Sequence, residues 1–328
     1  MKKILLIIIL VIFIIWIIYH EKQKTIVIGS GTAGAMYYPV ATSLCNVFNK
    51  YNHKYNIKCH AKITKGSEYN LHAIEEGEID MGIVQNNLQH DAYMGYGEFS
   101  DHPYRNLRLL FDLHSEYLTI IAKKGSGIKK FSDILGKRIN IGNIGSGSKI
   151  LFSQMMDKIK WNFSDFAQIY EESGSDIDNL LCESNNNKEI ADVAVYVVGH
   201  PNKSFEYVLD NCDTQLISLS ESEIKDFIGL SPIYFRKEFI PANTYKSQNK
   251  AILTFATKAS LTASKKLDSD IVYNFIKVLS EHKDELIAMQ PSLRSIIFAP
   301  GAAAAVIPAH KGMEKYLSLN KHDTNITN

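Results

Sequence analysis

The stretch that decides the fold is Thr25-Ile-Val-Ile-Gly-Ser-Gly-Thr-Ala-Gly-Ala-Met-Tyr-Tyr-Pro39. Residues 25–29 form a short apolar run that predicts a buried strand. Small residues then predict a tight turn, and the helix that we expect over residues 39–50 starts at a proline, which the first helical turn tolerates. A strand that leads through a glycine-rich turn into a helix is typical of an α/β protein with a parallel sheet.

Within this stretch, Gly29, Gly31 and Gly34 match the G-x-G-x-x-G pattern of dinucleotide-binding proteins. Those proteins also carry an acidic residue at the end of the second strand. Here the second strand, expected over residues 58–64, runs into Lys65 without such an acid. We therefore interpret the turn as a place where backbone N–H groups meet an anion at a helix N-terminus, and not as a nucleotide site.

Strand and helix patterns alternate along the rest of the chain. We expect further strands over residues 58–64, 81–84, 107–113, 117–122, 138–141, 193–197, 216–219 and 251–256. We expect further helices over residues 67–76, 128–135, 146–159, 176–182, 202–211, 221–228, 268–282 and 310–319. This alternation predicts mostly parallel sheets with helices on both faces, a fold that binds ligands beyond the carboxyl ends of its strands.

The chain of 328 residues is too long for one comfortable hydrophobic core. The strand, glycine-rich turn and helix of residues 25–50 are matched by a second such unit at residues 138–159. We therefore predict two α/β lobes, joined by hinge strands, with a cleft between them. The predicted parts are lobe I (23–115 and 245–320), lobe II (116–244) and a disordered tail (321–328).

The N-terminus predicts export. Met1-Lys-Lys3 is followed by an uninterrupted apolar run over residues 4–18, as in a secretory signal peptide. The next residues, Glu21-Lys-Gln-Lys24, contain no small-residue cleavage site. Residues 1–22 are therefore either a cleaved signal peptide or an N-terminal anchor in the inner membrane. Both alternatives place the folded part in the periplasm.

Charge and cysteine usage narrow the function further. The 36 basic and 35 acidic residues nearly cancel, so no basic face for nucleic acid is expected. The four cysteines, Cys45, Cys59, Cys182 and Cys212, allow three disulfide pairings in an exported protein. Pairing Cys45 with Cys59 and Cys182 with Cys212 would keep each bridge within one lobe, and four free buried thiols are the alternative. Their spacing matches no metal site.

Three more turns lie where an expected strand ends: Thr64-Lys-Gly-Ser-Glu-Tyr-Asn70, Val84-Gln-Asn86 and Gly142-Asn-Ile-Gly-Ser-Gly-Ser-Lys149. Each has an ordinary explanation as turn or capping chemistry, with Ser146 or Ser148 as a helix N-cap. Together they supply N–H groups, hydroxyls and amides that suit a carboxylate. No nucleophile, paired acids or metal ligands accompany them, so we expect binding without catalysis and without a cofactor.

The chain resembles the TAXI class of solute-binding receptors, which serve tripartite ATP-independent periplasmic (TRAP) transporters. The resemblance covers residues 25–317 and is carried, in the order of the family, by segments 28–39, 64–70, 77–85, 136–147, 199–201 and 307–312. It implies the fold of type II periplasmic binding proteins. It also implies a small carboxylate ligand, such as glutamate or 2-oxoglutarate, and a membrane permease as partner.

The resemblance also implies a set of ligand-binding residues, divided between the lobes. Lys65 adds a positive charge beside the pocket, and we include it among the candidates. For lobe I the candidates are Ser30, Thr32, Tyr37, Lys65, Ser67, Asn70 and Gln85. For lobe II they are Ser146, Gly147, Ser148 and Gly199.

Two other functions stay open. One is an exported enzyme that acts on a small anionic substrate, which would turn its ligand over. The other is a surface antigen that kept the fold and lost ligand binding. For the receptor we expect a monomer.

Overall fold

The computed structural model describes residues 23–320 except 54, 183–190, 231–232 and 300–306. The predicted signal peptide or anchor and the predicted tail, residues 321–328, lie outside the described residues. Within the part of the chain that is described, no helix is long and apolar enough to cross a membrane.

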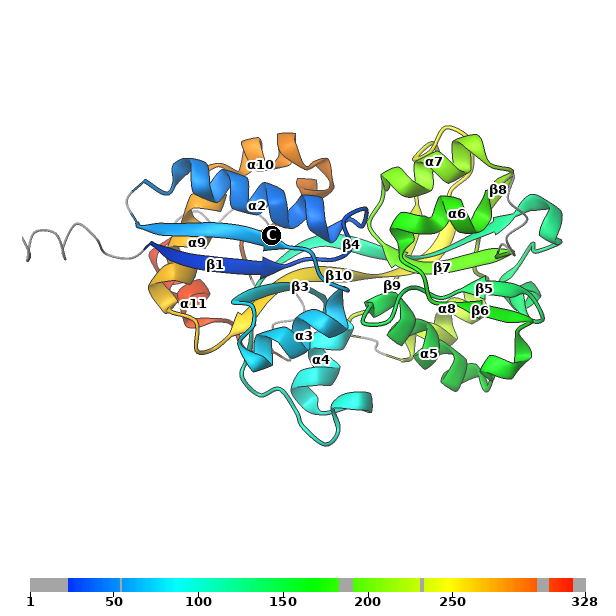
Figure 1. Cartoon of the computed structure of the whole chain (residues 1–328), viewed down its shortest axis with the longest axis horizontal. Helices are drawn as coiled ribbons and strands as arrows, with labels where there is room; N and C mark the ends of the chain where they lie inside the picture. The colour runs from blue at the N-terminus through cyan, green and yellow to red at the C-terminus, as the bar shows by residue number, and fades with distance from the viewer. Residues whose placement is uncertain (1–22, 54, 183–190, 231–232, 300–306, 321–328) are drawn as a thin grey trace, which may run out of the picture.

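Two α/β lobes lie side by side and share two long strands, β4 and β10 (Figure 1). The strands are β1 (Lys24–Gly29), β2 (Ile57–Lys62), β3 (Met81–Gln85), β4 (Leu107–Lys123), β5 (Arg138–Asn140), β6 (Gln168–Tyr170), β7 (Val193–Val198), β8 (Thr214–Ile217), β9 (Arg236–Ile240) and β10 (Ile252–Ser264). The helices are α2 (Tyr37–Tyr51), α3 (Ser67–Glu76), α4 (Asn86–Met94), α5 (Gly147–Ile159), α6 (Ile177–Leu181), α7 (Lys203–Asn211), α8 (Glu221–Ile228), α9 (Ser269–Glu281), α10 (Lys283–Met289) and α11 (Lys311–Leu319).

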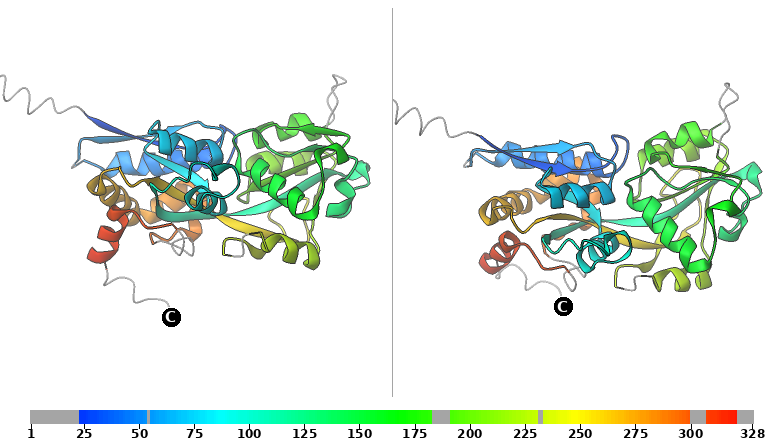
Figure 2. Two further views of the ribbon diagram at one scale, coloured as in Figure 1. Left: turned by 90° about the horizontal axis from the view of Figure 1, so that it is seen from below. Right: turned by 60° about the horizontal axis from the view of Figure 1, so that its bottom comes forward.

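One continuous path of strands runs through both lobes in the order β2-β1-β3-β10-β4-β7-β5-β6. The outer pairs, β1 with β2 and β3, and β5 with β6 and β7, are parallel. The central strands β4 and β10 are antiparallel, and their register shifts between Ala259 and Ser260. These two strands connect the lobes in every view (Figure 2). The predicted class is thus confirmed: a two-lobed α/β fold like that of type II periplasmic binding proteins, in which the outer strands of each lobe pair in parallel.

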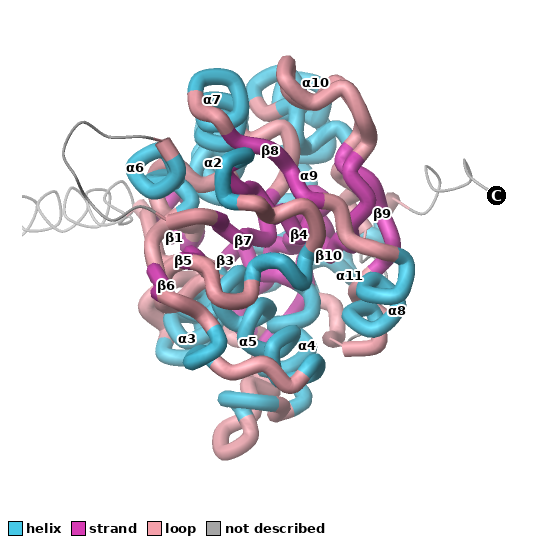
Figure 3. Tube along the Cα trace, turned by 90° about the vertical axis from the view of Figure 1, so that its right-hand side faces the viewer, coloured by secondary structure: helices cyan, strands magenta, loops and turns pink. Residues whose placement is uncertain are grey.

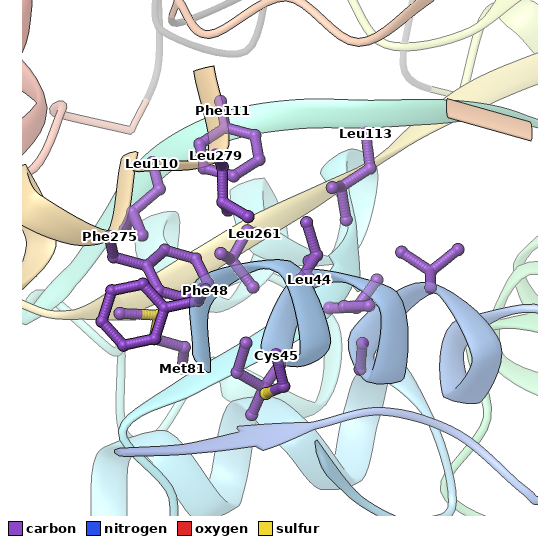
Figure 4. Close-up of a cluster of buried hydrophobic side chains, with 14 of the residues drawn as sticks. Leu44, Cys45, Phe48, Met81, Leu110, Phe111, Leu113, Leu261, Phe275 and Leu279 are labelled. Carbon is purple, nitrogen blue, oxygen red and sulfur yellow. The ribbon is translucent and has the colours of Figure 1, made fainter. Parts of the chain in front are cut away.

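Helices cover the strands on both faces, with α2 and α7 on one side and α3, α4 and α5 on the other (Figure 3). In lobe I, Leu44 and Phe48 of α2 pack with Phe275 of α9 and Leu261 of β10 in one apolar cluster (Figure 4). A second cluster fills the opposite face of the same strands. Lobe II has two such clusters as well. Strands buried on both faces are the reason why their sequences read as continuous apolar runs.

Several elements differ from their predictions. The strands expected over residues 107–113 and 117–122 are one strand, β4, because the polar residues between them continue the sheet and do not turn. The helix expected over residues 128–135 is only a 3₁₀ turn, Phe131–Ile134. Helix α4 was not expected, because its sequence of amides and a histidine has no clear apolar period.

Both disulfides that would stay within one lobe are present. Cys45 of α2 is joined to Cys59 of β2, and Cys182 at the end of α6 is joined to Cys212 at the end of α7. The first bridge fixes a helix to the edge strand of lobe I beside its core. The second joins the ends of two helices of lobe II beside one of its apolar clusters.

Replacing Cys45 and Cys59 together by alanine is expected to lower the free energy of unfolding by about 3 kcal/mol. The two cysteines are 14 residues apart, and the bridge limits the freedom of that loop in the unfolded chain. Guanidinium denaturation in non-reducing buffer measures the change. A double variant as stable as the parent protein would show that the bridge does not stabilise the fold.

Candidate functional site

A small cavity, with a volume of about 70 Å³, lies between the lobes at the carboxyl ends of the strands. Lobe I contributes the β1–α2 turn, the β2–α3 turn and the end of β3. Lobe II contributes the β5–α5 turn, residues 173–174 and the end of β7. Strand β4 supplies one residue, Glu116. The cavity therefore lies where an α/β fold places its ligands.

The wall from lobe I carries three buried polar side chains, Tyr37, Ser67 and Gln85. Gly66 occupies the N-cap position of α3 with φ of 120°, and Ser67 is the first helical residue. The Ser67 hydroxyl accepts a hydrogen bond from the Gln85 backbone N–H at 3.2 Å. It also lies 3.3 Å from the Tyr37 hydroxyl. The hydrogen bond from the Gln85 N–H connects the start of α3, after the β2–α3 turn, to the end of β3.

The wall from lobe II is the start of α5. Ser146 is the N-cap, and its hydroxyl accepts a hydrogen bond from the Lys149 N–H at 3.3 Å. The Ser148 hydroxyl accepts a hydrogen bond from the Val197 N–H at 2.9 Å, so its own hydrogen remains available for another acceptor. Gly147 lies between them and has no side chain to cover the backbone. The Lys149 side chain pairs with Glu171 at 2.8 Å.

Three helices begin at the cavity, α2 at Tyr37, α3 at Ser67 and α5 at Gly147. The first N–H groups of a helix have no partner within it, and the helix dipole places a partial positive charge there. Helix N-termini from both lobes therefore make the cavity attractive to an anion. Among the described lining residues, neither a guanidinium nor a buried ammonium group contributes to this attraction. Lys65 is the one basic residue among the described residues that line the cavity, and it is exposed.

Glu116 is an acidic residue of the same wall, and no motif in the sequence pointed to it. Its side chain is buried, and the Tyr37 O–H donates to its Oε2 at 2.7 Å. Burial raises the pKa of Glu116 to about 8, although hydrogen bonds from Tyr37 and Gln85 act in the opposite direction. The Nε2 atom of His114 is 3.9 Å from its Oε1, and burial lowers the pKa of His114 to about 3. The neighbouring imidazole is therefore neutral at physiological pH and supplies no counter-charge.

The lobes touch around the cavity, so the structure shows a closed clamp. The hydroxyls of Thr32 and Ser173 are 2.6 Å apart across the cleft. The Asn143 amide donates to the Lys65 carbonyl at 2.9 Å. The Tyr69 N–H, at the start of α3, donates to a lobe II carbonyl, that of Gly145, at 3.3 Å.

The structure places most of the candidate residues at this cavity, but not all. Thr32, Tyr37, Lys65, Ser67, Gln85, Ser146, Gly147 and Ser148 line it. Ser30 and Asn70 lie behind its wall, and Gly199 lies in a neighbouring cavity together with His114.

Asn70 and Ser30 hold the strand ends together. The Asn70 amide donates to the carbonyls of Ser30, at 2.7 Å, and Ile83, at 2.9 Å. The Ser30 hydroxyl donates to the Lys62 carbonyl at 2.7 Å. These bonds join the ends of β1, β2 and β3, from which the lobe I turns emerge.

The cavity also has lining residues that lie outside the candidate set. Asn143 and Ser173 are polar residues in turns. A search of the sequence for polar residues that follow a strand could have identified them. Tyr196 and Phe205 form apolar parts of the wall and look like ordinary core residues in the sequence.

Comparisons with known proteins identify a family. The model of the NMT1-like family matches residues 28–318, and the chain belongs to that family. Among solved structures, the chain is similar to a putative L-cystine ABC transporter from Listeria monocytogenes, with 13% identity, 82% of this chain and 95% of that chain covered, and a TM-score of 0.48. It is also similar to the alkanesulfonate-binding protein SsuA from Xanthomonas axonopodis pv. citri bound to MOPS, with 13% identity, coverage of 90% and 83%, and a TM-score of 0.43. The periplasmic aliphatic sulphonate binding protein SsuA from Escherichia coli gives 14% identity, coverage of 92% and 87%, and a TM-score of 0.44.

Proposed function

We propose that this member of the NMT1-like family is an extracytoplasmic solute-binding receptor that captures a small carboxylate between its lobes. The observation that carries the proposal is the cavity between the closed lobes, whose wall includes the first residues of three helices from both lobes. A carboxylate there replaces its water shell by N–H and hydroxyl donors that the fold already holds in place.

The proposed ligand is small because the closed cavity is small. A volume of about 70 Å³ leaves room for only a handful of water-sized groups. Glutamate and 2-oxoglutarate are the ligands that the TAXI resemblance suggests, and they define the chemical class to be tested first. The apolar side of the cavity, with Tyr196 and Phe205, would contact the carbon skeleton of such an acid.

The two-lobed form suits a receptor that delivers its ligand to a membrane protein. Strands β4 and β10 are the shared connections of the lobes that allow hinge motion, and ligand contacts on both lobes favour the closed state. We propose a TRAP-type permease as the partner, which takes up the released acid with an ion gradient. The receptor acts in the periplasm, free or tethered by its N-terminal segment.

A thermal-shift screen of small acids and amino acids tests this function. A ligand that binds the folded protein and not the unfolded chain raises the melting temperature by mass action. We expect at least one small carboxylate to raise it at millimolar concentration. If no carboxylate does so, the proposed ligand class is wrong.

Replacing Gln85 by leucine is expected to weaken binding of that carboxylate by roughly tenfold to a hundredfold, because a buried polar partner is lost. Gln85 lines the cavity and is 2% exposed, and no hydrogen bond to its Oε1 is found among the described residues. Gln168→Leu, on the exposed edge of β6, is the matched control and should bind as the parent does. Equal affinity of all three proteins would place the ligand elsewhere.

A further inference from the structure

Resting on this proposed function, we propose that the ligand is an amino acid, and that Glu116 binds its ammonium group while the helix N-termini bind its carboxylate. An amino acid is a narrower class than a small carboxylate, because it excludes 2-oxo acids and dicarboxylates without an amino group. It follows from the position of one carboxyl group in an otherwise electropositive cavity.

Among the residues that the structure describes, the only ion-pair partner within reach of Glu116 is the neutral His114. The hydrogen-bond donors of Glu116, namely Tyr37 and Gln85, are neutral as well. The nearby Lys258 directs its ammonium group to the Ser115 hydroxyl at 2.9 Å, and Ser115 is not part of the cavity wall. Lys65, in the turn after β2, is exposed. Without a ligand, the Glu116 carboxylate would be a buried and unpaired charge.

A buried unpaired carboxylate costs free energy, and the protein can avoid that cost in two ways. The carboxyl group can stay protonated, as its raised pKa of about 8 indicates for the cavity without ligand. Alternatively, a bound cation can supply the missing charge. The location of Glu116 in the wall of the ligand cavity, and not in an apolar cluster, favours a role toward the ligand.

The other groups of the cavity wall determine which second functional group a cationic ligand must have. The starts of α2, α3 and α5 favour a negative group, and Ser148 has a hydroxyl hydrogen to donate. The cavity is small, so both groups must lie close together in one molecule. A carboxylate and an ammonium group on one carbon atom meet this requirement, and that arrangement defines an amino acid.

The corresponding 2-oxo acid lacks the hydrogen atoms that Glu116 needs. Its carbonyl oxygen is an acceptor, and a carboxylate is an acceptor as well, so the two repel each other unless Glu116 is protonated. An amino acid instead makes a charge-assisted hydrogen bond, which is about twice as strong as a neutral one. An oxo acid can therefore contact Glu116 only while Glu116 is protonated, through a neutral hydrogen bond, whereas an ammonium group pairs with the ionised carboxylate.

Calorimetric titration with matched pairs tests the inference. The probes are L-glutamate with 2-oxoglutarate, L-alanine with pyruvate, and L-leucine with 4-methyl-2-oxopentanoate. For the pair that binds, we expect the amino acid to bind roughly tenfold to a hundredfold more tightly than its oxo analogue. Glu116→Gln should remove this preference, and Glu281→Gln, an exposed helical residue of lobe I, should keep it.

Proton release gives a second readout that needs no variant. An ammonium group beside Glu116 lowers its pKa, so binding at pH 7 should expel a proton, measured from titrations in buffers of different ionisation enthalpy. Proton uptake, or an oxo acid that binds as tightly as its amino acid, overturns the inference and leaves the receptor function standing. A small carboxylate that binds while no amino acid does overturns the inference alone, and the thermal-shift screen tests the receptor function separately.

Discussion

Replacing Gly147 by valine is expected to abolish ligand binding while both lobes stay folded. Gly147 is the first residue of α5, and a Cβ atom there would lie 2.6 Å from Cδ of Gln85, in the opposite lobe. Real Cβ atoms do not come so close to other atoms, and Gln85 is buried and has little room to move. The valine side chain would therefore keep the lobes apart, so that the ligand contacts one wall at a time.

Calorimetry with the carboxylate found by the thermal-shift screen measures the loss, and small-angle scattering with that ligand should show a more extended molecule than the parent. Gly125→Val is the matched control. A Cβ atom at Gly125 meets no atom within 4 Å, and its backbone, like that of Gly147, is not in the left-handed region. Parent-like affinity of the Gly147 variant would mean that binding does not require the closure seen here.

The second large effect concerns pH. Glu116 has a pKa of about 8 in the closed protein and 4.5 when exposed, so the folded state holds a proton that the unfolded chain releases. Stability from this group is fully present below pH 4.5 and is lost as the pH rises toward 8. The loss has an upper limit of about 5 kcal/mol, since each pKa unit corresponds to about 1.4 kcal/mol.

Glu116→Gln, which cannot ionise, should remove this loss. Without ligand, the parent is expected to lose stability relative to the variant between pH 5 and pH 8, as measured by urea denaturation. Burial lowers the pKa of His114 and of His200 to about 3, so protonation of these groups destabilises the folded protein toward acid pH, which is opposite to the effect of Glu116. A stability difference that is constant over this range would show that Glu116 is not buried in solution.

The sequence predicted the parts of the site that depend on local structure. A hydroxyl or glycine at the end of a strand stays there whatever surrounds it, and Thr32, Ser67 and the Ser146–Ser148 turn all reach the cavity wall. Where a side chain points depends on tertiary contacts. Asn70 lies at a strand end as well, but its amide turns to two backbone carbonyls and lies behind the wall.

Glu116 shows the limit of local patterns most clearly. It lies in Leu113-His-Ser-Glu-Tyr-Leu118, where polar residues suggested a turn between two strands. The structure has one long strand instead, because β4 crosses from one lobe to the other, and the closed lobes bury its middle. That burial requires segments far apart in the sequence, such as residues 37 and 85, to meet at residue 116.

The central claim, a clamp that holds a small carboxylate and does not transform it, is tested most directly by a calorimetric titration with recovery of the ligand. We predict saturable binding of one carboxylate per chain, and recovery of that ligand chemically unchanged after long incubation. Turnover of the ligand would contradict the claim and favour an exported enzyme. Absence of binding for every small carboxylate would contradict it too, and would favour a surface protein that kept this fold without its ligand.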